Sequence, residues 1–255
     1  MLQLTKDVIQ WIKDYYSEIN DPQAKAIIGI SGGKDSTICA ALLVEALGKD
    51  RVIGVLMPNN KQSDIEDSYR VCRKLDIKAH VVNIGPAYAE LVNGIYDSDP
   101  DLAYPEPDMI KTNLPARLRM ATLYAIAALY PNSRVVNTSN FSERYVGYST
   151  KFGDGAGDFS PLGNLTVTHI LAIGDDLGLP YDLVHKEPSD GMSGKTDEDN
   201  LGFTYKQLDY YLLNRDELVP AEVKLKINKR HIANYHKLVD MARYDGSRLM
   251  LKGRL

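Results

Sequence analysis

The sequence has little cysteine, few histidines and no paired metal-ligand spacing. Only two cysteines occur in 255 residues, Cys39 and Cys72, which is too few for a disulfide framework and lacks the spacing of a zinc site. Five histidines are scattered along the chain, and His231 and His236 are five residues apart, so they do not share one face of a helix. We therefore predict two structural thiols and no zinc.

Long apolar runs and strong net charge are also missing. No apolar stretch approaches the length of a membrane span, and the first residues lack the basic and apolar blocks of a signal peptide. We expect a cytoplasmic protein without membrane contact. A net charge of −4 argues against general nucleic-acid binding. Basic residues are in excess over residues 221–255, which favours either a solvated helical face or the binding of an anion.

Short apolar strands alternate with amphipathic or apolar helices along the chain. We expect strands at residues 26–30, 52–56, 79–84 and 134–138, with a fifth near 183–184, and helices at 5–17, 36–47, 63–75, 86–92 and 110–130. This alternation predicts an α/β fold with a doubly wound, mostly parallel five-stranded sheet and helices on both faces. Residues 97–108, 149–161 and 187–200 are expected to be loops. Without an internal repeat or linker, residues 1–255 are expected to form a single domain.

A glycine-rich segment joins the first expected strand to the next helix. It consists of Gly29, Ile30, Ser31, Gly32, Gly33, Lys34, Asp35 and Ser36. Glycines let a backbone approach an anion closely, and the first N–H groups of a helix lack partners within the helix, so this segment favours a phosphate. A Walker loop is excluded, because only three residues separate Gly29 from Gly33 and Asp35 stands between Lys34 and Ser36. A glycine-rich turn without a ligand is the alternative.

The pattern Ser-Gly-Gly-x-Asp-Ser resembles the pyrophosphate loop of the N-type ATP pyrophosphatases, which split ATP between the α and β phosphates. Further segments are similar to ammonia-dependent NAD synthetases. These are Asn-x-x-Ala-Arg-x-Arg-Met from Asn113, Thr138 followed five residues later by Glu143, and Thr-Lys-x-Gly-Asp-Gly-x-x-Asp from Thr150 to Asp158. Matches continue at residues 186–189, 201–205 and 236–237, in the order of that family. The resemblance therefore spans nearly the whole chain.

This resemblance implies a Rossmann-like fold of the adenine nucleotide α-hydrolase type and a ligase activity. The implied reaction joins ammonia to deamido-NAD at the expense of ATP, through an acyl-adenylate, and releases NAD, AMP and pyrophosphate. Asp35, Lys34 and Asp158 would be catalytic, and Asp35 and Glu143 would hold Mg²⁺. ATP contacts are implied for Gly29, Ile30, Ser31, Gly32, Gly33, Lys34, Asp35, Ser36, Thr138 and Ser189. Deamido-NAD contacts are implied for Arg117, Lys151, Asp158, His236 and Lys237, and we expect Pro115 to place Arg117 near the start of a helix.

The family also implies a homodimer with deamido-NAD bound at the subunit interface. The apolar residues of the helix at 110–130 could serve that interface or the core; they are Met120, Leu123, Ile126 and Leu129. No amidotransferase segment precedes the glycine-rich loop, so we expect the nitrogen donor to be free ammonia or ammonia from a separate partner.

One position departs from the family pattern. Several members carry an ATP-contacting lysine nine residues after the last aspartate of the glycine loop, where this chain has Val167. We hypothesise that Lys186 or Lys195 supplies the missing cation.

Two other readings of the sequence stay open. The glycine-rich loop alone would suit another ATP pyrophosphatase, such as the synthetase domain of GMP synthetase or a tRNA-thiolating enzyme. A nucleotide-binding sensor without turnover is an alternative of another class, and the presence of both Asp35 and Glu143 argues against it.

Overall fold

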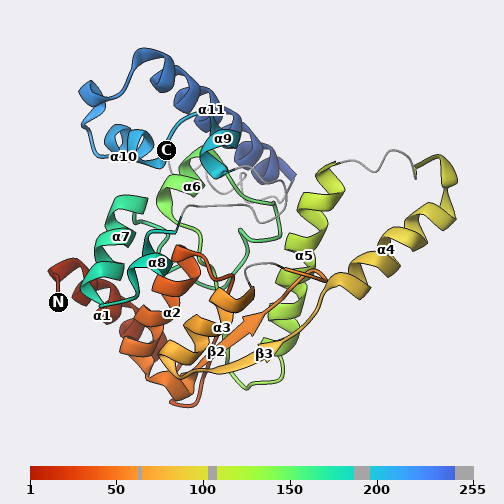
Figure 1. Ribbon diagram of the computed structural model, residues 1–255, viewed down its shortest axis with the longest axis horizontal. Helices are drawn as coiled ribbons and strands as arrows, with labels where there is room; N and C mark the ends of the chain where they lie inside the picture. The colour runs from red at the N-terminus through yellow and green to blue at the C-terminus, as the bar shows by residue number, and fades with distance from the viewer. Residues whose placement is uncertain (63–64, 103–107, 187–195, 245–255) are drawn as a thin grey trace.

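Four parallel strands form the centre of the computed structural model, which describes residues 1–62, 65–102, 108–186 and 196–244, the last ten of these by backbone only (Figure 1). The strands are β1 (Ala26–Gly29), β2 (Val52–Leu56), β3 (Lys78–Val81) and β4 (Arg134–Val136), and their spatial order is β3-β2-β1-β4. Ala26 lies opposite Val52 on one side and Arg134 on the other. The glycine-rich segment therefore follows a central strand, where the strand order reverses.

Helices account for most of the remaining described chain. They are α1 (Gln3–Glu18), α2 (Lys34–Leu47), α3 (Ile65–Leu75), α4 (Gly85–Ser98), α5 (Asp108–Ala127), α6 (Phe141–Val146), α7 (Val167–Asp176), α8 (Tyr181–Val184), α9 (Asp197–Leu201), α10 (Tyr205–Leu212) and α11 (Ala221–Tyr244). Short 3-10 turns occur at Lys49–Arg51, Pro100–Leu102 and Asp216–Leu218. No helix in the described part of the chain has both the length and the apolar character needed to cross a bilayer.

The sheet is covered on both faces, as the apolar runs of its strands predict. Ile28 points into one core with residues of α1, α2, α7 and α8, whereas Ile27 points into the opposite core with Ile126 of α5. Successive side chains of a strand point to opposite faces, so a strand buried on both sides is apolar at every position. This confirms the doubly wound arrangement.

A third apolar cluster lies beside the sheet, where α6, α10 and α11 gather at the top of Figure 1. Val146, Val167 and Leu208 are among its buried members. This cluster places α6, which follows β4, against α10 and α11. The site described below lies between it and the sheet.

The predicted fifth strand near 183–184 is wrong. Leu183 and Val184 are buried, but they belong to the short helix α8, which starts just after Pro180. A short apolar run satisfies either a buried strand or a buried helical turn, and a proline is well tolerated where a helix begins. The nearest equivalent of a fifth strand is Phe159, which makes an isolated parallel bridge with Val136 of β4.

Other boundaries also differ from expectation. α4 continues to Ser98 and α5 begins at Asp108, so the ends of the expected 97–108 loop are helical, while residues 103–107 lie outside the described chain. Pro115 lies inside α5, and Arg117 is therefore in the middle of this helix and not near its start. Prolines are rarely found in helix interiors, and this one made the sequence prediction of a boundary wrong.

Both cysteines are free and buried, as predicted. Cys39 lies on α2 and is inaccessible, and Cys72 lies on α3 with its sulfur facing Gly54 of β2. Burial raises the pKa of both thiols, that of Cys72 to about 11.

Candidate active site

A large cavity opens at the carboxyl ends of β1, β2 and β4. Its volume is about 1390 Å³, and its walls come from residues 29–36, residues 57–62, one face of α5 and the loop 147–156. Thr138, Lys186 and Asp197 also line it. A cavity at this edge of a doubly wound sheet is the expected position of a nucleotide site, and the volume is sufficient for a nucleotide.

The glycine-rich loop forms one end of this cavity and is tied to the first turn of α2. The N–H of Ser31 donates to Ser36 Oγ at 3.2 Å, and Ser36 Oγ donates to the carbonyl of Gly33 at 3.1 Å. Gly32 has φ +79°, and a Cβ atom there would lie 2.9 Å from Cβ of Asp67 on α3. Only glycine fits this position, because the loop both turns into the left-handed region and packs against α3.

Asn140 connects the loop to α6. It is fully buried, and its side-chain amide donates to Asp35 Oδ1 at 3.2 Å. Asn140 and Glu143 also form a capping box at the start of α6, in which the backbone N–H of Asn140 donates to Glu143 Oε2 at 3.2 Å. One asparagine therefore positions both carboxylates that the sequence suggested as metal ligands.

These carboxylates lie in a buried, charged environment. Burial and the nearby charge of Asp35 raise the pKa of Glu143 to about 8. Lys34 is almost fully buried, and its Nζ lies 2.9 Å from Asp35 Oδ2 and 5.4 Å from the centre of the Tyr205 ring. Burial disfavours the charge of Lys34, but Asp35 and Glu143 outweigh it and raise the pKa of its ammonium.

Asp35 and Glu143 are suited to Mg²⁺ by type, since both offer hard oxygen ligands. Within the described residues, no group of three or more histidine, cysteine or acidic side chains could hold a metal ion alone. Mg²⁺ typically takes one or two carboxylates and completes its coordination with phosphate oxygens and water. Burial and the charge of Asp35 both disfavour the ionised form of Glu143, and a divalent cation between these side chains would favour it. The residues therefore fit a metal that arrives with a phosphate ligand.

The structure places Lys186 at the cavity and Val167 in a core. Lys186 Nζ lies 2.7 Å from Oδ2 of Asp67, the residue that packs against Gly32. This aspartate therefore holds an ammonium group near the glycine-rich loop. Val167 is buried in the third cluster at the start of α7. Lys195 lies outside the described residues.

Residues predicted to contact deamido-NAD do not all gather at the cavity. Arg117 is exposed, and its Nε donates to the carbonyl of Lys151 at 3.2 Å, so these two residues adjoin the cavity walls formed by Ala116 and Thr150. Asp158 is exposed on the outer side of β4, where it accepts hydrogen bonds from Val135 N–H at 2.7 Å and Tyr124 Oη at 3.2 Å. Ser189 lies outside the described residues, and His236 and Lys237 belong to the part of α11 whose side chains are not described.

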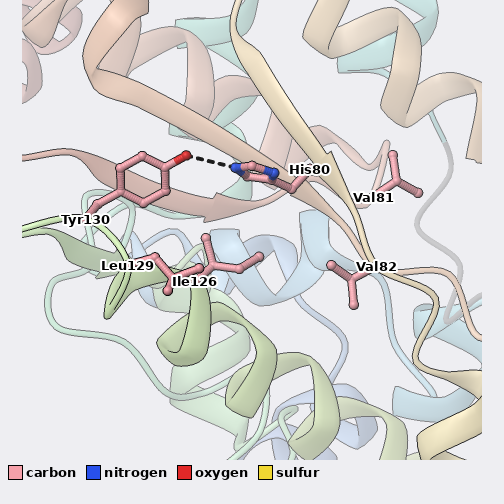
Figure 2. Close-up of a pocket in the computed structure, with 6 residues that line it drawn as sticks. All are labelled: His80, Val81, Val82, Ile126, Leu129 and Tyr130. Atoms are coloured by element: carbon pink, nitrogen blue, oxygen red, sulfur yellow. Dashed lines mark hydrogen bonds between the residues drawn. The ribbon is translucent and has the colours of Figure 1, made fainter.

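A second hollow of about 390 Å³ lies at the free edge of the sheet. Its walls come from β3 and the end of α5, and Tyr130 Oη and His80 Nε2 make a 2.9 Å hydrogen bond beside it (Figure 2). Val81, Val82, Ile126 and Leu129 complete its lining, which is mainly aliphatic. It offers neither a glycine-rich loop nor a carboxylate, so we place the candidate active site at the larger cavity.

Comparison with known proteins identifies the family of this chain. The sequence profile of the NAD synthase family matches residues 4–247. The chain belongs to this family. Among NAD synthase relatives, the NH3-dependent NAD⁺ synthetase of Pyrococcus furiosus is 42% identical over 212 residues, which cover 82% of this chain and 76% of the relative.

Two solved structures extend the NAD synthase match to the fold. NMN synthetase from Francisella tularensis has a TM-score of 0.81 at 35% identity and covers 92% of this chain and 94% of its own. NH3-dependent NAD synthetase from Campylobacter jejuni has a TM-score of 0.71 at 27% identity, with the same two coverages.

Sequence reasoning missed three residues of this candidate site. Arg119 lines the cavity, and its Nε donates to the carbonyl of Met57 at 3.1 Å, whereas Arg117 does not line the cavity and donates to the carbonyl of Lys151 beside it. The helical spacing of Asn113, Ala116 and Met120, which also line the cavity, would have selected Arg119. Asn140 could have been found from its capping-box spacing to Glu143. No local pattern predicts Asp197, because its position depends on the tertiary packing of α9.

Proposed function

We propose that this chain catalyses the ATP-dependent amidation of deamido-NAD by ammonia. Membership of the NAD synthase family supports the activity. The chemistry is supported by a cavity lined by the glycine-rich loop with Asp35, and by Glu143, which lies buried near Asp35. A carboxylate is a poor acyl donor to ammonia, so it must first be activated. In the proposed reaction, a carboxylate oxygen of deamido-NAD attacks the α phosphorus of ATP and pyrophosphate leaves. Ammonia then attacks the acyl carbon, AMP leaves, and the amide loses a proton to give NAD.

We infer that the glycine-rich loop binds the departing pyrophosphate. Ser31, Gly33 and Ser36 line the cavity at the start of α2, where backbone N–H groups and the positive end of the helix dipole favour an anion. Stabilising the charge that develops on the leaving group is the main electrostatic task of such a site. Thr138, at the end of β4, also lines the cavity and is proposed to contact ATP.

Asp35 and Glu143 are the proposed ligands of Mg²⁺. When bound, the metal ion would neutralise negative charge on the phosphates. The protein's own contribution is positional, because Asn140 holds both carboxylates in place through its side-chain amide and its backbone N–H. Lys186 is the proposed additional ATP contact, supported by its position on the cavity wall.

Arg117 and Lys151 are proposed to bind deamido-NAD beside the cavity. Both carry positive charge suited to a dinucleotide pyrophosphate, and they lie together where α5 meets the loop 147–156. Asp158, His236 and Lys237 remain proposed contacts of the same substrate. Asp158 lies on the outer face beside Tyr124 of α5, so its role depends on a site shared between subunits.

A homodimer is therefore part of the proposal. Large apolar side chains are exposed on α4 and α5, which form the right-hand side of the molecule in Figure 1. They are Leu91, Ile95, Met109 and Tyr124, and Leu129 follows just after α5. Of the four residues suggested from sequence, only Leu129 is strongly exposed, because Ile126 is buried, Leu123 packs against the core and Met120 lines the cavity.

A direct assay tests the activity. Purified protein with ATP, Mg²⁺, deamido-NAD and ammonium should form NAD, AMP and pyrophosphate in equal amounts. Omission of ammonium should stop NAD formation. Accumulation of ADP and inorganic phosphate would contradict the proposal, because it would mean that the β–γ bond of ATP is broken.

One comparison points to a second candidate substrate. The NMN synthetase of F. tularensis resembles this chain more closely in TM-score and identity than the NAD synthetase of C. jejuni does. Its product implies the mononucleotide acid as substrate, which carries the same reacting carboxylate. Measuring kcat/KM for both acids decides between them. We expect deamido-NAD to be preferred, and a preference of more than about tenfold for the mononucleotide would reassign the substrate.

A further inference from the structure

The position of Lys34 is unfavourable for a purely structural residue. Its ammonium is buried, with 7% of the side chain exposed, and it belongs to the first turn of α2, where the helix dipole repels a cation. Burying an ion pair rarely adds stability compared with apolar residues of similar size. We therefore expect the positive charge of Lys34 to have a function in ligand binding.

Acidic groups surround this ammonium on several elements. Asp35 on α2 is in direct contact, and Glu143 on α6 and Asp197 on α9 contribute attraction from nearby. Asp197 is held by Tyr148, whose hydroxyl donates to Oδ1 at 3.1 Å. The cluster thus carries up to three negative charges and one resident positive charge, contributed by the protein itself.

Lys34 also borders the space that the phosphates of ATP would occupy. It lines the cavity beside Ser31 and Gly33, and a lysine ammonium on a flexible four-carbon stem can change partners without moving the backbone. A triphosphate in the glycine-rich loop would compete with Asp35 for this ammonium, because it brings several negative charges close to it.

We propose that Lys34 acts as a tethered cation that occupies the carboxylate cluster in the nucleotide-free enzyme and transfers to the phosphates when ATP binds. This inference rests on the proposed function of the cavity as an ATP site. The transfer releases Asp35 Oδ2 for the metal ion that accompanies the nucleotide. Free protein then binds divalent cations weakly, and nucleotide and metal bind with positive coupling.

The proposal predicts effects of opposite sign for one substitution. Lys34→Met keeps the apolar stem and removes the charge. Without nucleotide, the variant should bind Mn²⁺ at least about tenfold more tightly than the natural protein, because the competing cation is gone. In the presence of a chelator, it should bind metal-free ATP at least about tenfold more weakly, because the phosphates lose a cationic partner. Both affinities can be measured by titration calorimetry, with no turnover required.

Lys206→Met is the matched control. Lys206 is exposed on α10 next to Tyr205 and lies outside the cavity lining, so both affinities should be unchanged. Lys34→Gln serves as a second variant if the methionine protein fails to fold, and the same two shifts are expected. Mn²⁺ affinity that stays the same or falls in the folded variant would overturn the proposal, as would unchanged affinity for metal-free ATP. NAD formation is measured separately on the natural protein. Failure of the two binding predictions would therefore not contradict the proposed function.

Discussion

At the scale of single residues, Gly32 is subject to two constraints, a positive φ angle and close packing against α3. Its φ of +79° strains any other residue, and its closeness to Asp67 leaves no space for a Cβ. Gly32→Ala should lower the free energy of unfolding by roughly 1–3 kcal/mol and weaken ATP binding at least about tenfold, because the glycine-rich loop must shift away from α3. Thermal unfolding and ATP titration measure the two effects.

Gly48 offers the matched control for this prediction. It has φ +83° at the end of α2, and a Cβ atom there would have no neighbour within 4 Å among the described residues. Gly48→Ala should cause a similar loss of stability from backbone strain alone, with ATP affinity unchanged. Equal losses of ATP affinity in both variants would show that general destabilisation, and not the contact with α3, explains the result for Gly32.

Lys186 is the second residue whose role can be isolated. A charge-assisted contact to phosphate typically contributes about 1.5–3 kcal/mol, so Lys186→Ala should weaken ATP binding by roughly ten- to a hundredfold. Lys49→Ala is a suitable control, because Lys49 also forms an ion pair with an aspartate, Asp76. Its side chain is exposed, and it does not line the cavity. Unchanged affinity in the Lys186 variant would remove this residue from the ATP site.

At the scale of elements, Asp209 fixes how α6 and α7 meet α10. This buried carboxylate accepts from Ser142 Oγ at 2.6 Å and from both the N–H and the Oγ1 of Thr168, at 2.6 and 2.7 Å. Asp209→Ala should lower the free energy of unfolding by roughly 2–4 kcal/mol, because the buried hydroxyl of Ser142 and two donor groups of Thr168 lose their acceptor. Chemical denaturation measures this loss.

The control for Asp209 is an acidic residue without such partners. Glu217→Ala, in the exposed turn Asp216–Leu218, should change stability by less than about 0.5 kcal/mol. Asp209→Asn retains one acceptor oxygen and should be intermediate. An Asp209→Ala protein as stable as the natural one would mean that water replaces the carboxylate without cost.

The elements were predicted well where a pattern is local. The four strands and the helices that cover them are recognisable from apolar runs, and Asp35 and Thr138 lie at the edge of the sheet where the large cavity opens. Leu183 and Val184 were misread because two apolar residues contain no period. Asp197 was not predicted at all, since only the folding of α9 beside Tyr148 brings it to the cavity.

At the scale of the whole molecule, the exposed apolar side chains of α4 and α5 test the proposed dimer. Leu91→Glu combined with Ile95→Glu should shift the sedimenting species from a dimer to the 28.4 kDa monomer, because charges would be buried at the interface. NAD formation should fall with dissociation if the substrate site is shared between subunits. A natural protein that is fully active as a monomer would contradict this prediction.

Tyr181→Glu is an informative control for the dimer. Tyr181 is a large exposed aromatic residue on α8, whose buried residues pack in the core on the opposite face of the sheet from α5. This variant should sediment like the natural protein. Dissociation caused by both sets of changes would point to general loss of solubility or folding.

The burial of Cys39 and Cys72 makes the native protein almost inert towards thiol reagents. Burial both blocks access and keeps the sulfurs protonated, so Ellman's reagent should modify neither in the folded protein and both after denaturation. A cysteine installed at any exposed position would then be the sole reactive handle for a fluorophore or spin label, with the two natural thiols left in place.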